Sequence, residues 1–217
     1  MDRNRLSLGE PPTDCTPLRS GPGHVPSKTI FRCSRNVHSE PWFFSSDGGG
    51  RFDLRSPVGT CYLGSDKVAA LREVLGPDYT TGAIVAHKFF DERRIWNAVP
   101  ISAAWSRGVA DLLEDQWDAH GITTELFTTT RYPLTQAWAA CFHAAGWQGL
   151  RVGLRHVLAA DRSGVALFGP EGAQVTDARF VATGTAIESH DRDAFTAATG
   201  IRIEATLVAA TALHVIT

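Results

Sequence analysis

Apolar residues recur at helical spacing in three stretches of this chain, and each stretch predicts a helix. The first runs over 66–75, with Ser65 as a favourable N-cap and a Gly-Pro pair after its end. The second is expected from Ser102 to about Ala119, because large apolar residues recur at every fourth position: Trp105, Val109, Leu113 and Trp117. The third is the clearest, with a proline suited to its first turn and six apolar positions on one face: Leu134, Ala137, Trp138, Cys141, Phe142 and Ala145, following Pro133.

Short runs rich in β-branched and aromatic residues predict strands between and after these helices. They cover 29–33, 59–63, 83–90, 150–154 and 164–168. The last two flank an Asp-Arg-Ser-Gly turn and are expected to form a hairpin. The tail predicts a helix over 191–198 and strands at 201–203 and 213–216. Short strands mixed with three to four helices indicate an α+β fold and not a regular doubly wound one.

The domain organisation follows from a change of composition near residue 26. Residues 1–26 contain five prolines and few large apolar groups, which predicts an irregular or disordered N-terminal arm. Residues 27–217 are expected to form a single domain, since a chain of 217 residues buries one sizeable core.

Composition narrows the class of protein. The formal net charge of -2 gives no basis for direct binding to nucleic acid. No apolar run approaches the roughly 18 residues needed to span a bilayer, so no membrane association is expected. The N-terminus lacks the apolar stretch of a secretory signal, so we expect a cytoplasmic protein.

The four cysteines are scattered and form neither a C-x-x-C pair nor a cluster at metal-ligand spacing. No metal site is therefore expected. A disulfide is not expected in a cytosolic chain, and Cys141 on an apolar helix face is interpreted as a core residue.

No standard catalytic or nucleotide-binding motif is present, but one group of residues in the first half carries chemistry. Three successive glycines, 48–50, precede Arg51. Their N–H groups, Gly50 included, are suited to face a phosphate, with the guanidinium adding charge-assisted hydrogen bonds. A flexible surface loop with a solvated arginine is the alternative.

Tyr62 and Glu73 are the other candidates. Glu73 lies on the helix face with Ala69 and Ala70, whose small side chains leave room for a ligand, although an ordinary solvated glutamate fits the same spacing. Tyr62 is suited either to stack on a ligand ring or to pack in the core. The histidines share no spacing that points to a ligand set or a base.

Together these residues resemble the RES family, named for an arginine, a glutamate and a serine. The resemblance covers about residues 29–170. It rests on four stretches of sequence: FRCSR (31–35), GGGRFDLRSPVGTCYLGSDKVAALREVLG (48–76), YPLTQAWAACFHAAGWQGLRVGLRH (132–156) and VALF (165–168). RES proteins are similar in fold to ADP-ribosyltransferases. The resemblance therefore implies an ADP-ribosyltransferase-like domain.

The resemblance also implies roles for individual residues. Arg51 and Glu73 match the arginine and glutamate of the name and are the catalytic candidates, and Arg32 and Tyr62 match further pocket residues. The serine is the departure, because Gly153 occupies its place in the strand after the third helix and Ser163 lies too far along to replace it without a shift.

The implied function is that of a toxin that binds NAD and cleaves its nicotinamide–ribose bond, by hydrolysis or with inorganic phosphate as co-substrate. Two alternatives stay open: a mono-ADP-ribosyltransferase acting on a protein, and an inactive module that binds a nucleotide or a partner. The family implies a cognate antitoxin as partner, and a homodimer is left open.

Overall fold

The computed structural model describes residues 7–76, 82–101, 108–154 and 162–205. At its centre is an eight-stranded mixed sheet with the order β1 (Gly23–His24), β7 (Val109–Asp111), β8 (Gly149–Gly153), β9 (Ser163–Pro170), β4 (Val58–Gly64), β2 (Ile30–Arg35), β6 (Arg93–Pro100) and β11 (Phe180–Ala186). β7 and β8 run parallel, and the other neighbours in this sheet run antiparallel. Two small sheets pair β3 (Trp42–Phe44) with β10 (Gly172–Gln174) and β5 (Ile84–Ala86) with β12 (Arg202–Glu204).

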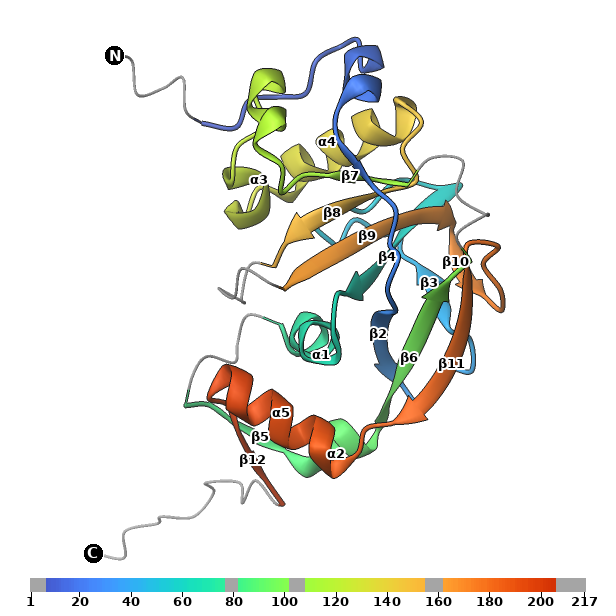
Figure 1. The fold of residues 1–217 in the computed structure, drawn as a ribbon, viewed down its shortest axis with the longest axis vertical. Coiled ribbons are helices and arrows are strands. Elements are labelled where there is room, and N and C mark those ends of the chain that lie inside the picture. Colours follow the sequence, from blue (N-terminus) through green and yellow to red (C-terminus); the bar gives the residue numbers. More distant parts are fainter. Residues whose placement is uncertain (1–6, 77–81, 102–107, 155–161, 206–217) are drawn as a thin grey trace, which may run out of the picture.

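Helices gather at both ends of the sheet. The α-helices are α1 (Lys67–Leu75), α2 (His87–Asp91), α3 (Glu125–Thr128), α4 (Tyr132–Ala144) and α5 (Ser189–Thr199). In Figure 1, α3 and α4 lie at one end of the molecule, α2 and α5 at the other, and α1 between them. None of the helices in the described part is long and apolar enough to cross a membrane. The α+β architecture in a single domain confirms the expected fold class.

The strongest sequence patterns are confirmed. α1 and α4 form where apolar spacing predicts them, α5 covers the helix expected in the tail, and Pro133 lies in the first turn of α4. β2, β4 and β12 also lie where the sequence predicts strands. β8 and β9 pair antiparallel as expected for the hairpin, although residues 155–161 between them lie outside the described residues. The strand expected at 213–216 lies outside them too.

The N-cap of α1 is Asp66 and not Ser65. The Asp66 side chain accepts a hydrogen bond from the N–H of Ala69, 2.6 Å away. The Ser65 hydroxyl instead accepts from the N–H of Ser163 in β9, at 3.0 Å. A tertiary contact with the neighbouring strand therefore decides which of two adjacent capping residues is used.

The prediction of a helix over 102–119 is wrong for those of its residues that the structure describes. Residues 102–107 lie outside the described part. Val109–Asp111 forms β7, and Asp115–His120 forms a 3₁₀ helix. Trp117 is buried in the core, and its indole N–H donates to the carbonyl of Asp111, at 2.6 Å. The apolar residues at four-residue spacing therefore belong to a strand and a 3₁₀ helix and not to one α-helix.

The strand expected over 83–90 is only half right. Ile84–Ala86 forms β5, but His87–Asp91 forms the short helix α2. Phe90 and Val85 are both buried, in the same core cluster. A short, uniformly apolar run cannot by itself distinguish a buried strand from a buried helix.

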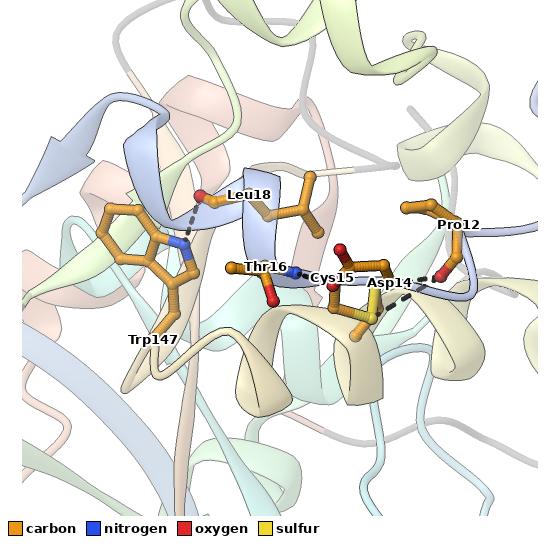
Figure 2. The surroundings of a disulfide bond; sticks show 7 residues. Pro12, Asp14, Cys15, Thr16, Leu18 and Trp147 are labelled. Carbon is orange, nitrogen blue, oxygen red and sulfur yellow. Dashed lines mark hydrogen bonds between the residues drawn. A yellow bond between two sulfur atoms is a disulfide. The ribbon is translucent and has the colours of Figure 1, made fainter.

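The N-terminal segment, expected to be irregular or disordered, contains ordered elements in residues 7–26. Thr16–Ser20 forms a 3₁₀ helix, and β1 pairs with β7. Leu18 is fully buried, and its carbonyl accepts from the indole N–H of Trp147 at 3.0 Å (Figure 2). This part of the arm therefore contains short ordered elements that contact the rest of the domain.

A disulfide between Cys15 and Cys141 joins the arm to α4 (Figure 2). The expectation of no disulfide is thereby corrected. Cys141 does lie in the core, as expected, but as a bonded residue. The separation of the two cysteines by 126 positions gave no spacing pattern, and only the packing of the 3₁₀ helix on α4 brings them together.

Candidate functional site

A cavity of about 360 Å³ lies where the central sheet parts. β2 and β4 are neighbours but share a single register pair, Phe31 with Gly64. Beyond that pair the two strands enclose the cavity together with α1, the 49–52 loop and the ends of β8 and β9. Six residues singled out from the sequence line it: Arg32, Gly50, Arg51, Tyr62, Glu73 and Gly153.

The glycine loop is not the open phosphate cradle that the sequence suggests. The N–H of Gly50 donates to Asp53 Oδ2 and that of Gly49 to Asp47 Oδ1, each at 2.8 Å. Both donors are therefore engaged by carboxylates of the same loop. A Cβ atom at Gly50 would overlap Asp53 and Tyr62, so close packing requires glycine here.

Asp53 is a buried carboxylate that sequence reasoning missed. Besides the Gly50 N–H, it accepts from the hydroxyls of Tyr62 and Ser45, each at 2.9 Å. The Tyr62 hydroxyl in turn accepts from the N–H of Phe52, at 2.8 Å. Burial, followed by the charge of Asp53, raises the pKa of Tyr62. Tyr62 thus remains neutral, with its one hydroxyl hydrogen used within the protein.

Arg51 is held by residues at the start of α4. Its guanidinium carbon lies 5.2 Å from the centre of the Tyr132 ring, and its Nη1 donates to the carbonyl of Thr129. The Thr135 hydroxyl donates to the backbone carbonyl of Arg51. Gln136 adds two hydrogen bonds, to the carbonyls of Gly48 and Gly50. These partners are some eighty positions from the loop, so no local pattern indicates them.

Glu73 projects from α1 into the cavity. Its side chain is exposed, and it lines the cavity. Desolvation raises the pKa of Glu73, while the charges of Arg51 and Arg72 act to lower it. The carboxylate is thus flanked by cations, of which Arg72 is buried and donates to the carbonyl of Gly76 at 2.8 Å.

Arg32 and Gly153 lie on different strands of the cavity wall. Arg32 extends from β2, and its Nη1 donates to the carbonyl of Pro41 at 3.0 Å. At Gly153, at the end of β8, an added Cβ atom would lie 3.3 Å from the Phe127 ring. The aromatic side chain therefore occupies space beside the position of the expected serine.

Ser163 is closer to Gly153 than the sequence suggests, because the two are register partners on β8 and β9. Ser163 is nevertheless buried and is not among the residues lining the cavity. Its hydroxyl accepts from Arg151 Nε, at 3.3 Å. Arg155 and His156, the next residues along the chain, lie outside the described part.

Comparisons with known proteins agree with this architecture. The model of the RES domain family matches residues 29–187. Among solved structures, the chain is similar to a chain of the M. tuberculosis MbcT–MbcA toxin–antitoxin complex, with 16% sequence identity and a TM-score of 0.57. The match covers 85% of this chain and 98% of that chain, and at this identity it shows the fold alone. No curated protein sequence matches. Because the family match spans most of the chain, this protein belongs to the RES domain family.

Proposed function

We propose that this protein binds NAD in the cavity and cleaves the bond between nicotinamide and ribose. One observation carries the proposal: a carboxylate, two guanidinium groups and a tyrosine ring line a single cavity. The carboxylate is Glu73, on a wall separate from Arg32 and Tyr62. Such a set provides both anion binding and stabilisation of positive charge, the two requirements of this reaction.

The chemistry needs charge stabilisation more than proton transfer. When the bond breaks, its electron pair moves to the nicotinamide nitrogen, so the leaving group departs neutral. The ribose carbon becomes oxocarbenium-like. Ionised Glu73 would hold the ribose hydroxyls and offset this charge. An oxygen of water or of inorganic phosphate then bonds to the carbon, and its surplus proton passes to solvent.

The other residues would bind and orient the dinucleotide. Arg51 and Arg32 would contact the pyrophosphate. Tyr62 would contribute its ring to the nicotinamide riboside, because its hydroxyl hydrogen is donated to Asp53. Gly50 has no side chain and would let the loop approach the dinucleotide closely, while its N–H stays hydrogen-bonded to Asp53. No metal ion is needed in this scheme.

Gly153 favours a second candidate, a RES module with weak or no catalysis. Glycine offers no hydroxyl at the position of the family serine, and Phe127 lies beside it. A mono-ADP-ribosyltransferase, with a protein side chain as acceptor, remains the other alternative. We propose that the protein acts in the cytoplasm.

A partner protein that covers the cavity completes the proposal. The similar solved structure is described as a toxin–antitoxin complex. A chain that destroys NAD would need such control in the cell that makes it. We therefore propose a cognate antitoxin.

The deciding experiment follows nicotinamide release from NAD by the purified protein, in three arms: buffer alone, added inorganic phosphate, and added cell extract. Release in buffer indicates hydrolysis, release that depends on phosphate indicates phosphorolysis, and release that depends on extract with labelled protein indicates ADP-ribosyl transfer. Release no faster than a protein-free blank in all three arms would refute NAD cleavage.

A further inference from the structure

Phe43 is the one aromatic side chain among the large apolar residues that the described part of the chain exposes. It is 48% exposed, whereas its neighbours Trp42 and Phe44 are buried at 2% and 1%. Isolated exposed apolar residues are common on proteins and need no explanation. Phe43 and Val74 differ from the other exposed apolar residues because they line the same cavity as Glu73, and of these two only Phe43 is aromatic.

The alternation of side chains along β3 directs Phe43 toward the cavity. Residues two apart in a strand share a side, so Phe43 projects on the side of Ser45. The Ser45 hydroxyl donates to Asp53 beneath the glycine loop. Trp42 and Phe44 project on the other side, into the core.

The ring of Phe43 is also only partly covered by its neighbours. Its register partner on β10 is Ala173, whose methyl group covers little of a ring. Within the part of the chain that the structure describes, no other aromatic ring packs against it. A half-exposed aromatic ring at a cavity that also holds charged groups is suited to stack on a planar ligand.

Arg32 connects this ring to the expected phosphate site. The guanidinium of Arg32 donates to the carbonyl of Pro41, two residues before Phe43. Two residues of chain span at most about 7 Å, comparable with the separation of a phosphate from the base of the same nucleotide. A phosphate on Arg32 therefore places its own nucleoside beside Phe43.

We infer that Phe43 is the stacking platform for the adenine base of the dinucleotide, at the β3 rim of the cavity. The nicotinamide end then lies at Glu73, with the pyrophosphate between the two ends. This inference rests on the proposed function and adds to it a residue that recognises the part of the substrate remote from the reaction. It also makes adenine nucleotides without nicotinamide ligands of the same cavity.

The test measures binding of ADP and turnover of NAD and of nicotinamide mononucleotide, which has the scissile bond but no adenine. Phe43→Ala should weaken ADP binding and raise KM for NAD by between about 5-fold and about 150-fold, the range of base–aromatic stacking. Turnover of the mononucleotide should stay unchanged. Phe43→Trp should restore both, and Val99→Ala, an equally exposed strand position outside the cavity, should change neither.

The outcomes separate this inference from the proposed function. If Phe43→Ala cleaves NAD at the wild-type rate and with the wild-type KM, the stacking role alone is overturned. Binding of ADP that depends on Phe43, without cleavage, upholds the stacking role and overturns catalysis. If the wild-type protein neither binds ADP nor consumes NAD, both are overturned.

Discussion

At the scale of single residues, the charge of Glu73 is central to the proposed chemistry. Glu73→Gln keeps the shape of the side chain and removes its charge. Turnover should fall by about 100- to 1,000-fold, since such an electrostatic group contributes about 2.7–4 kcal/mol to the barrier. KM should change little, because the charge acts mainly on the transition state. Steady-state kinetics would measure both constants.

The matched control is Glu92→Gln, a glutamate at the end of α2 that pairs with Lys88 and lies outside the cavity. It should retain wild-type kinetics. Wild-type turnover in Glu73→Gln would show that Glu73 is a surface residue and that the catalytic site lies elsewhere.

The pH dependence of NAD cleavage should also report on Glu73. Desolvation raises the pKa of this carboxyl, and activity requires the ionised form. Activity should therefore be lost as pH falls through the raised pKa, at a higher pH than for an ordinary glutamate. Arg51→Ala removes a charge that lowers this pKa, so the acid limb of its residual kcat/KM should move to higher pH. Arg51→Lys should move it less, and an identical limb in all three proteins would argue against Glu73.

Substitution of Gly153 tests whether the missing serine of the family limits activity. Gly153→Ser should raise turnover or affinity by up to about tenfold, since a neutral hydrogen bond contributes roughly 0.5–1.5 kcal/mol. The new Cβ atom lies 3.3 Å from the Phe127 ring, so the ring must shift slightly. Gly153→Ala adds this atom without the hydroxyl and is the control. Equal losses in both variants would indicate a steric clash, and no change in either would place the serine position elsewhere.

At the scale of elements, the N-terminal segment is attached to α4 by the disulfide between Cys15 and Cys141. A cross-link over 126 positions stabilises by about 5 kcal/mol in the chain-entropy model. The variant with serine at both positions should therefore unfold at a lower temperature than the oxidised protein. Thermal unfolding with and without dithiothreitol measures this.

Reductant should lower the melting temperature of the wild-type protein and leave that of the double variant unchanged. Cys33 and Cys61 are unpaired and buried, so they are common to both proteins and do not affect the comparison. Insensitivity of the wild-type protein to reductant would show that the bond does not form in solution.

At the scale of the whole molecule, the proposal concerns the effect of the protein on a cell. Expression of this chain alone in bacteria should slow growth and lower cellular NAD, and Glu73→Gln should relieve both effects. Growth and extracted NAD are measured at matched soluble expression. Normal growth and normal NAD with abundant wild-type protein would favour the inactive module.

The sequence by itself determined the parts that depend on local patterns. α4 was predictable because six apolar residues share one face and Pro133 suits its first turn. Six candidate residues were singled out because their types and order resemble a family, and all six line one cavity. Glu73 could be identified as a candidate because a helical wheel places it away from the core face of its helix.

The features that depend on packing between distant segments were decided only by the tertiary structure. The Trp117 spacing predicted a helix, but pairing with β8 makes Val109–Asp111 a strand, and strand pairing is not encoded in local spacing. The N–H of Gly50 points to Asp53, because that buried carboxylate must be satisfied where it lies. Cys15 meets Cys141, and Phe43 meets the cavity, because distant segments pack together. A contact between residues far apart in the chain leaves no periodic pattern from which a single sequence could predict it.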